Sequence, residues 1–475
     1  MSGQKVHFVG VGGIGMSGLA KVMLEQGCEV SGSDLHPNTL TQRLAEMGAR
    51  IYGGHDAANV NEADLVVISS AVPADNVELA EAGRRELRVI KRAEMLARLC
   101  EGRRLVAVAG THGKTTTSAM IAWALLEAGL DPTLLVGGEL LDLGTNARLG
   151  RGQHLVAEAD EFDGSFLSLH PFVAVLTNIE PDHLDYYGTV EALGEAFARF
   201  LAQVSPQGHI VACSDDLRLR ALLELRRHSE GSNASLGAAG SPHLANQPTP
   251  QVVAYSLHER TADWRAADVR LKSDGSEFTL MHLGKPLGRC RLGLPGRHNV
   301  ANALGAIAAA DVLGVTPERA MEALARFSGT RRRFEVRGEA GGVTVVEDYA
   351  HHPTEIAATL AAARQRFPCR RLVAVFQPHT FSRTRLLFDE FARCFAEADE
   401  ATITDIYAAR EQNVWGSSSA ELAQAIKRPP ARYIADMHAA AAYLAESLRP
   451  GDVLLVLGAG DINEIVDEVL KGLSR

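Results

Sequence analysis

A glycine-rich segment early in the chain has the residue types needed to bind phosphate. The segment GTHGKTT, residues 110–116, follows the apolar run 105–109 and precedes a helix predicted over 118–128. Backbone N–H groups of such a loop can bind phosphate oxygens, while Lys114 contacts the β- and γ-phosphates and the Thr115 hydroxyl binds Mg²⁺. Val108 stands where the general phosphate-loop pattern has its first glycine. The order of strand, Gly-Lys-Thr and helix still predicts a phosphate site, and a loop without a ligand is the alternative.

Acidic side chains follow the ends of two later apolar runs. EADEFD at 158–163 follows a strand predicted at 154–157, and NIEPDHLD at 178–185 follows one predicted at 172–177. Carboxylates this close repel one another unless cations or solvent separate them. Since both segments end strands of one domain beside a phosphate loop, they predict a shared Mg²⁺ site. A solvated acidic turn and a structural histidine are the alternatives.

The N-terminal segment has the spacing of a diphosphate-binding turn. Gly10, Gly12 and Gly15 lie between an apolar run at 6–9 and a helix-like stretch at 16–25, and Asp34 ends the next predicted strand. A tight glycine turn lets a diphosphate approach the positive end of a helix, with a carboxylate available to a ribose or base. The motif leaves open which diphosphate binds, because NAD, FAD and a UDP-sugar each contain one.

Three polar motifs follow later in the chain. GRHNVAN at 296–302 begins a predicted helix, and its amides are expected to cap that helix. DYAHHP at 348–353 and QPHTFSRTR at 377–385 each follow a predicted strand. Two arginines past a strand end, Arg383 and Arg385, are suited to binding a carboxylate or phosphate, and a solvated basic loop is the alternative.

Short apolar runs alternate with helix-like segments through most of the chain, which predicts parallel sheets with crossover helices. We expect an α/β protein of three domains, at 1–103, 104–327 and 328–475. The first and third are expected to be Rossmann-like. The central one is expected to be a phosphate-loop ATPase-like parallel sheet with a small antiparallel sheet. A stretch rich in Gly, Ser, Asn and Pro predicts an exposed loop over 229–251.

Composition excludes several classes of protein. The 475 residues exceed what one hydrophobic core usually serves, and the ordinary hydrophobic (46%) and charged (22%) fractions exclude a wholly disordered chain. A formal net charge of −10 argues against a nucleic-acid partner, which usually requires a basic face. Without a signal peptide or an apolar run near the ~20 residues that cross a bilayer, we expect a cytoplasmic protein with no membrane insertion. The six scattered cysteines predict reduced thiols.

Together these motifs resemble those of the Mur ligase family of bacterial cell-wall synthesis, over essentially the whole chain. The resemblance rests on VGGIGMSGLA and SGSD in the first domain, on GTHGKTTT, EADE, TNIEPDHLD and PGRHNVAN in the second, and on EDYAHHPTE and FQPHTFSRTR in the third. It implies a ligase that uses ATP and Mg²⁺ to join L-alanine to the carboxylate of UDP-N-acetylmuramate through an acyl phosphate, forming ADP and phosphate. The first domain is expected to bind the UDP-sugar, the second ATP and the third the amino acid.

The resemblance also implies roles for individual residues, matched motif by motif. The expected catalytic residues are Lys114, His183, His352 and Arg383. The expected ATP contacts are Gly110, Thr111, His112, Gly113, Lys114, Thr115, Thr116, Asn299, Asn302, Arg333 and Asp348. The expected UDP-sugar contacts are Gly10, Gly12, Gly13, Gly15, Asp34 and Ser70. The amino acid is expected to contact His352, His379 and Arg383, and Mg²⁺ to be held by Thr115, Glu158 and His183.

Two departures from the family pattern bear on the substrate. Some relatives have arginine where this chain has Thr380, which affects how the amino acid is recognised. Several sister ligases bridge their metals with a carbamoylated lysine soon after the motif of His183, but this chain has no lysine between Lys114 and Lys272. That absence agrees with an enzyme that adds L-alanine.

Two other enzyme functions stay open at this point, besides a non-catalytic nucleotide-binding regulator, which would leave the carboxylate and histidine groups near the phosphate loop unexplained. One is a recycling ligase that joins a tripeptide to the same UDP-sugar. The other is an NAD-dependent oxidoreductase, which would account for the glycine spacing and Asp34 but leaves GTHGKTTT unexplained. The sequence does not distinguish a monomer from a homodimer.

Overall fold

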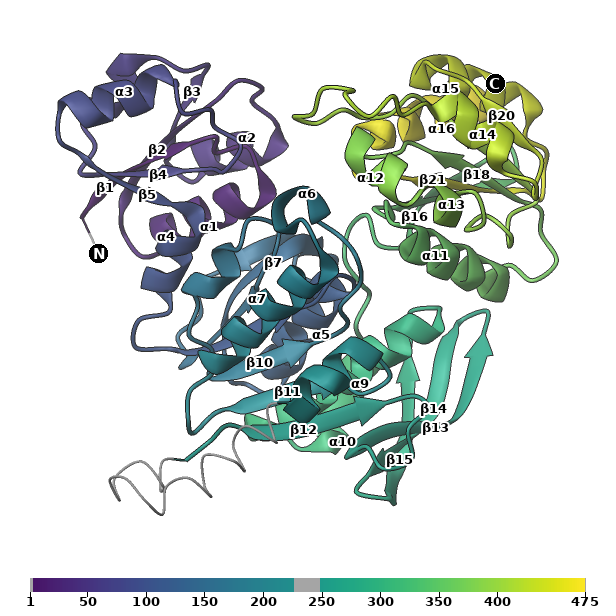
Figure 1. Ribbon diagram of the computed structural model, residues 1–475, viewed down its shortest axis with the longest axis horizontal. Coiled ribbons are helices and arrows are strands. Elements are labelled where there is room, and N and C mark those ends of the chain that lie inside the picture. Colours follow the sequence, from purple (N-terminus) through teal and green to yellow (C-terminus); the bar gives the residue numbers. More distant parts are fainter. Residues whose placement is uncertain (1–2, 226–247, 475) are drawn as a thin grey trace.

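The computed structural model describes residues 3–225 and 248–474 of the chain. They form three lobes, with the N-terminal and C-terminal lobes side by side on the central one (Figure 1). Each lobe contains its own sheet, which confirms the predicted three-domain α/β fold. Most of the loop predicted over 229–251 lies outside the described residues, and Gln251 begins a strand. No helix in the described part of the chain is both long and apolar enough to cross a membrane.

The N-terminal domain has a parallel sheet in the order β3-β2-β1-β4-β5. From β1 the chain adds β2 and β3 on one side of the sheet, and it then adds β4 and β5 on the other side. The strand order therefore reverses between β1 and β4, and a crevice opens at the carboxyl ends of these two strands. The glycine segment after β1 lies at that crevice. The strands are β1 (Lys5–Val9), β2 (Glu29–Asp34), β3 (Arg50–Gly53), β4 (Leu65–Ile68) and β5 (Arg88–Lys91), and the helices are α1 (Ile14–Glu25), α2 (Thr39–Glu46), η1 (Ala57–Val60), α3 (Val77–Arg84) and α4 (Arg92–Leu99).

The central domain has, among its described residues, a ten-stranded sheet in the order β15-β14-β13-β12-β11-β10-β6-β9-β7-β8. The antiparallel strands β13–β15 join the parallel part through the pairs Tyr255–Trp264 and Ser256–Arg265, and β8 pairs antiparallel with β7 at the other edge, so all ten strands form one continuous sheet. The strands are β6 (Arg104–Ala109), β7 (Thr133–Leu140), β8 (Thr145–Arg148), β9 (His154–Glu158), β10 (Val173–Leu176), β11 (His209–Cys213), β12 (Gln251–Ser256), β13 (Trp264–Lys272), β14 (Gly275–His282) and β15 (Lys285–Leu292).

Two helices of this domain are buried on nearly every side, as expected for helices with apolar residues around their whole circumference. They are α5 (Lys114–Glu127), which follows the phosphate-loop segment, and α9 (Arg297–Val312), which packs against it. The other helices include η2 (Ser165–Ser168), α6 (Leu184–Tyr187), α7 (Val190–Ala202) and α10 (Pro317–Ala325), and residues 217–225 are helical as well.

The C-terminal domain has a sheet in the order β16-β17-β21-β18-β19-β20, parallel except for the edge strand β16. The last strand, β21, lies in the middle, and separate apolar clusters cover the two faces. The strands are β16 (Glu335–Ala340), β17 (Val343–Asp348), β18 (Leu372–Phe376), β19 (Glu400–Ile403), β20 (Ala431–Tyr433) and β21 (Val453–Leu457). The helices are α11 (Pro353–Arg366), α12 (Phe381–Leu386), α13 (Phe388–Phe391), α14 (Ser419–Ala425), α15 (Met437–Ser447), η3 (Ile462–Glu464) and α16 (Ile465–Leu473).

The N-terminal domain is joined to the central domain more closely than the C-terminal domain is. Most of its buried apolar residues belong to one cluster with those of the central domain, while Val9, Val60, Val66 and Ala82 form a small cluster of their own. The clusters of the C-terminal domain are separate. Polar contacts reinforce this junction: Lys21 Nζ donates to the carbonyl of Ala147 at 2.6 Å, and Asn146 Nδ2 donates to the carbonyl of Ile14 at 3.1 Å. Among the described residues, the C-terminal domain has no member in the shared cluster, and it is joined to the central domain by polar side-chain contacts such as Arg383 with Asp182 and by backbone hydrogen bonds at 329–331.

Trp264 should be important for the stability of the central domain. It is 1% exposed, stacks on His282 with ring centroids 4.0 Å apart, and lies where the parallel and antiparallel strands meet. We expect Trp264→Ala to lower the free energy of unfolding by about 3–5 kcal/mol, because it removes a large buried side chain. Urea unfolding followed by circular dichroism measures this. The control, Trp415→Ala, removes a half-exposed tryptophan and should change the free energy of unfolding by less than about 0.5 kcal/mol. Equal losses of stability in the two variants would contradict the stabilising role of Trp264.

Candidate active site

The turn between β6 and α5 is built from glycines that no other residue can replace. Gly110 and Gly113 have φ angles of +131° and +82°. A Cβ at Gly110 would lie 2.2 Å from Thr177 Oγ1, and one at Gly113 would lie 2.7 Å from Asn302 Oδ1. The turn thus aims the N-terminus of α5, with its unpaired N–H groups, at the edge where the parallel strands end, which is where an anion binds well.

Lys114, the first residue of α5, is already held in place by protein oxygens. Its Nζ donates to the carbonyl oxygens of Gly110 (2.6 Å) and Thr111 (3.2 Å) and to both carboxylate oxygens of Glu161 (3.0 and 2.9 Å). A phosphate that binds in the loop therefore meets a lysine positioned by the loop itself, and must share it with Glu161.

The acidic residues after β9 keep this lysine charged. Burial by itself would lower the pKa of Lys114, but the carboxylates of Glu161, Asp160 and Glu158 outweigh burial and raise it to about 12. Glu161, which the sequence did not single out within the EADEFD motif, is the carboxylate that forms the ion pair. The pair is buried, so separating its members without a substitute would leave an uncompensated charge.

Two of the three predicted Mg²⁺ ligands lie close together. Thr115 and Glu158 both pack against the Gly137–Gly138 segment of β7, where the Glu158 carboxylate accepts a hydrogen bond from the Gly137 N–H. Their oxygens suit Mg²⁺, which prefers hard oxygen ligands. The ring of His183, the third predicted ligand, packs edge-on against Phe162 with the ring centroids 5.1 Å apart.

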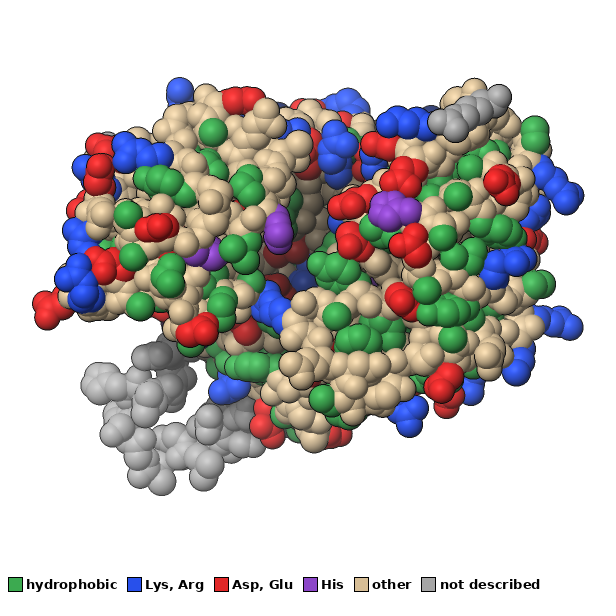
Figure 2. All heavy atoms as spheres, turned by 90° about the horizontal axis from the view of Figure 1, so that it is seen from above, with side chains coloured by type: hydrophobic (Ala, Val, Ile, Leu, Met, Phe, Trp, Pro, Cys, Tyr) green, Lys and Arg blue, Asp and Glu red, His purple; other side chains and the backbone are tan. Residues whose placement is uncertain are grey.

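A pocket between the central and C-terminal domains brings together predicted ATP-binding residues from both. Its wall includes seven of them: His112, Gly113, Thr116, Asn299, Asn302, Arg333 and Asp348. The two amides are fixed to each other and to the start of α9, since Asn302 Nδ2 donates to Asn299 Oδ1 (3.2 Å) and Asn299 Nδ2 to the carbonyl of Pro295 (2.7 Å). Figure 2 shows the molecule hollowed between its two outer lobes, with charged side chains around the hollow.

The C-terminal side of this pocket is anchored by Asp348, at the end of β17. Its carboxylate accepts hydrogen bonds from the N–H groups of Phe334 and Ala350, both at 2.8 Å. Burial raises the pKa of Asp348 to about 6 even though Arg333 opposes the rise. Arg333 lies over the Tyr349 ring, 5.1 Å from its centroid, which aims the guanidinium toward the pocket.

A second pocket lies in the same interdomain cleft and contains the predicted amino-acid contact Arg383. The guanidinium reaches across the cleft to Asp182, donating from Nε (3.0 Å) and Nη2 (2.9 Å) to one carboxylate oxygen, and Nη1 lies 3.1 Å from His379 Nδ1. Burial lowers the pKa of His379 to about 4, so its ring is neutral at pH 7. Thr380, the departure from the family pattern, also lines this pocket and has a left-handed φ of +69°.

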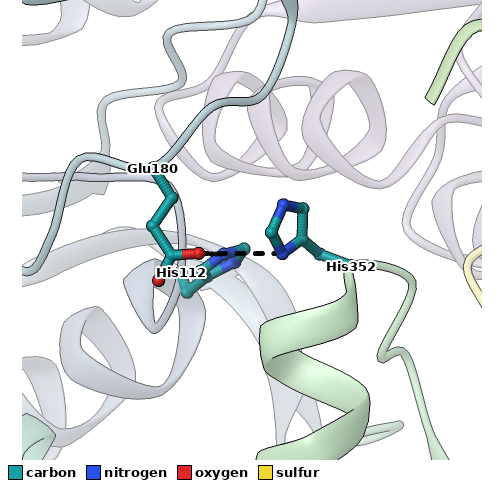
Figure 3. A group of neighbouring side chains, drawn as sticks. All are labelled: His112, Glu180 and His352. Atoms are coloured by element: carbon teal, nitrogen blue, oxygen red, sulfur yellow. Dashed lines mark ion pairs between the residues drawn. The ribbon is translucent and has the colours of Figure 1, made fainter. Parts of the chain in front are cut away.

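His112, Glu180, His352 and Glu355 form a compact polar cluster where the phosphate loop meets α11. Figure 3 shows His112 and Glu180 of the central domain facing His352, the residue that caps α11. His112 lies between two carboxylates, with Nδ1 3.2 Å from Glu355 Oε1 and Nε2 3.5 Å from Glu180 Oε2. Burial alone would lower the pKa of His112, but these two partners raise it to about 9.

Several residues of this site were not among the sequence predictions. Glu161, Glu180 and Asp182 belong to acidic motifs that the sequence analysis recognised, and Glu355 follows the histidine pair of HHPTE. Membership of these motifs was thus a signal in the sequence that could have pointed to these four residues. What the sequence could not show is that Asp182 pairs with Arg383 and Glu355 with His112, because each pair joins segments far apart in the chain.

The predicted UDP-sugar contacts lie together at the crevice of the N-terminal domain. Gly12 N–H donates to Asp34 Oδ2 at 2.8 Å, and a Cβ at Gly12 would lie at the same distance from that oxygen, so Asp34 stabilises the glycine turn itself. Ser70 lies nearby, and its carbonyl accepts a 3.2 Å hydrogen bond from Arg410 of the C-terminal domain. Arg92, which the sequence did not single out, lies against Gly15 and adds a cation beside the turn.

Comparison with known proteins gives matches along the whole chain. Residues 5–104 match the model of the Mur ligase family, catalytic domain; residues 108–310 match the Mur ligase middle domain; and residues 332–460 match the Mur ligase, glutamate ligase domain. A UDP-N-acetylmuramate–L-alanine ligase of Geobacter sp. strain M21 is 47% identical over 99% of this chain and 98% of its own length.

Solved structures agree with these matches. A UDP-N-acetylmuramate–alanine ligase from Thermotoga maritima is 28% identical, with a TM-score of 0.80 over 98% of each chain. A murein peptide ligase from Psychrobacter arcticus is 27% identical, with a TM-score of 0.72 over 100% of this chain and 99% of its own. An NAD-dependent oxidoreductase is not favoured, because all three domains are matched by ligase models. On its sequence, its fold and the arrangement of its site, this chain belongs to the Mur ligase family.

Proposed function

We propose that this protein is an ATP-dependent ligase that joins L-alanine to the carboxylate of UDP-N-acetylmuramate, forming ADP and phosphate, in peptidoglycan precursor synthesis. The observation that carries the proposal is the pocket in which the phosphate loop, α9 and the end of β17 meet. The 47% identity to a ligase named for these two substrates supports the choice of substrates. Residues 1–103 would bind the UDP-sugar, residues 104–327 ATP and residues 328–475 the amino acid.

The first half of the reaction makes the carboxylate reactive. A carboxylate is a poor electrophile until one of its oxygens becomes part of a phosphate leaving group, so a phosphoryl group must pass to it from ATP. Lys114 would exchange part of its contact with Glu161 for the transferring phosphoryl oxygens, at the helix N-terminus where negative charge is stabilised. Thr115, Glu158 and His183 would hold Mg²⁺, which offsets repulsion between the phosphates and the carboxylate.

The second half joins the amine. The amino group attacks the acyl phosphate, and phosphate leaves from a tetrahedral intermediate. His352 and His379 are neutral at pH 7, because burial lowers both pKa values to about 4, so their rings can accept hydrogen bonds from the amine. Arg383 is suited to the carboxylate of the amino acid or the acyl phosphate, and Asp182 fixes its position.

The recycling ligase has weaker support than the L-alanine enzyme. The murein peptide ligase structure is 27% identical to this chain, whereas the L-alanine ligase relative is 47% identical over nearly the full length of both.

Because both proposed nucleotide substrates are made inside the cell, we also propose that the reaction takes place in the cytoplasm.

The proposed substrates can be tested by measuring phosphate release from ATP and Mg²⁺. We expect release only when UDP-N-acetylmuramate and L-alanine are both present, since the amine must consume the acyl phosphate for turnover. Omission of either substrate, and replacement of L-alanine by a tripeptide, glycine or L-serine, are the controls. Faster turnover with the tripeptide would favour the recycling ligase, and amide formation without ATP consumption would refute the proposed mechanism.

Loss of the Lys114 ammonium should abolish catalysis through charge rather than folding. We expect Lys114→Ala to lower kcat about a hundred- to a thousand-fold or more, because the lysine stabilises charge that develops on the transferring group. The substitution also leaves the buried Glu161 without its partner, which destabilises the domain.

The double variant Lys114→Ala/Glu161→Gln separates these two effects. It should regain stability, measured by thermal unfolding, but not activity. Activity close to that of the unmodified enzyme in either variant would show that Lys114 does not have the proposed role.

A further inference from the structure

The cluster of His112, Glu180 and His352 has the dimensions of a small metal site. One ligand atom from each residue can be chosen so that all three lie within 4.8 Å of one another. Glu180 Oε2 is 3.5 Å from His112 Nε2 and 3.9 Å from His352 Nδ1. Ligand atoms around a tetrahedral Zn²⁺ at about 2.0–2.1 Å are roughly 3.3 Å apart, so small side-chain rotations would complete the site.

The side chains have unused binding capacity in a buried place. His352 is 4% exposed, and within the described residues the Nε2 of His112, the atom that faces Glu180, is buried without a hydrogen-bond partner. A buried polar atom without a partner normally has a specific reason, such as an ion that binds there. The Nδ1 of His352 accepts only a long hydrogen bond, 3.3 Å, from the Thr354 N–H.

The protonation states suit a cation as well. Burial lowers the pKa of His352 to about 4, which leaves its imidazole neutral at pH 7. Burial opposes ionisation of Glu180, but the hydrogen bond and charge of His112 lower its pKa to about 2. Two of the three groups thus have the form that binds metal, and His112 would release one proton when the metal binds.

The surrounding residues hold these side chains as the outer partners of a metal site do. The Nδ1 of His112 is 3.2 Å from Glu355 Oε1, so the ring can donate to that carboxylate while Nε2 faces Glu180. The Thr354 hydroxyl donates to Glu180 Oε2 at 2.6 Å. An imidazole oriented by a carboxylate in this way is the usual arrangement of metal-binding histidines.

We propose that His112, Glu180 and His352 form a binding site for a divalent transition-metal cation of the Zn²⁺ class. Two imidazoles and one carboxylate favour such a cation over Mg²⁺, which prefers oxygen ligands. The site shares no residue with the predicted Mg²⁺ ligands Thr115, Glu158 and His183. Because His112 and Glu180 belong to the central domain and His352 to the C-terminal domain, the cation would link the two domains.

A cation that links the central and C-terminal domains would slow the turnover of the ligase. His112 and Glu180 line the nucleotide pocket, so a cation between them and His352 would hold that pocket closed. We expect Zn²⁺ to inhibit the ligase, and this consequence rests on the proposed function. Binding itself does not, and can be measured without ATP or Mg²⁺.

The test is a titration of the purified full chain with Zn²⁺, followed by calorimetry, and with Co²⁺, followed by its visible absorption. We expect one saturable site in the wild type with a Co²⁺ spectrum typical of nitrogen and oxygen ligands. His352→Ala and Glu180→Gln should weaken binding at least 100-fold. Glu355→Gln should weaken it about 10- to 100-fold, as is typical when the outer partner of a ligand is lost.

Two variants serve as matched controls. His379→Ala removes another, partly buried imidazole from the same domain, and Glu158→Gln alters the predicted Mg²⁺ site; both should keep the Zn²⁺ affinity within about threefold. Thermal unfolding without metal checks that each variant is folded. Absence of saturable binding in the wild type, or equal affinity in His352→Ala and His379→Ala, would overturn the proposed site. Neither result would affect the ligase proposal, which the phosphate-release assay tests separately.

Discussion

The turn after β6 is the constraint on which the rest of the site depends. Gly110 leaves no space for a side chain beside Thr177, and Gly113 leaves none beside Asn302. These close approaches bring the end of β10 and the start of α9 against the first turn of α5. As a result the helix N-terminus, Lys114 and two amides meet at one edge of the sheet, where phosphate can be bound by N–H groups and a cation together.

The three domains are attached by different forces, which bears on how the enzyme works. The N-terminal and central domains share an apolar cluster, so separating them would expose hydrophobic surface to water. The described contacts between the central and C-terminal domains around the site are polar, among them Arg383 with Asp182 and His112 with Glu355. Polar contacts can be exchanged for water or for ligands at smaller cost. The structure therefore favours motion of the C-terminal domain when substrates enter and products leave.

Much of the fold could be predicted because parallel α/β sheets leave a clear sequence pattern. Strands buried on both faces are short continuous apolar runs, as at 105–109 and 453–457, and the polar motifs follow directly after such runs. Glu161, Glu180 and Glu355 were not predicted as site residues, although the motifs that contain them were recognised. Several carboxylates occur within a few residues of each other, and local spacing cannot tell which one faces a lysine or histidine from a distant segment.

The order of residues along the chain sets the chemistry that is possible here: a phosphate loop, acidic groups after strand ends, and histidine and arginine in the last domain. These follow from local order along the chain, since a strand, a turn and a helix place their own residues. Which residues pair with one another, in contrast, depends on how the domains pack. Lys114 pairs with Glu161, His112 lies between Glu180 and Glu355, and Arg383 reaches Asp182, because the packing of domains brings these charges close enough to bury them together. That choice is made by burial and electrostatics in three dimensions.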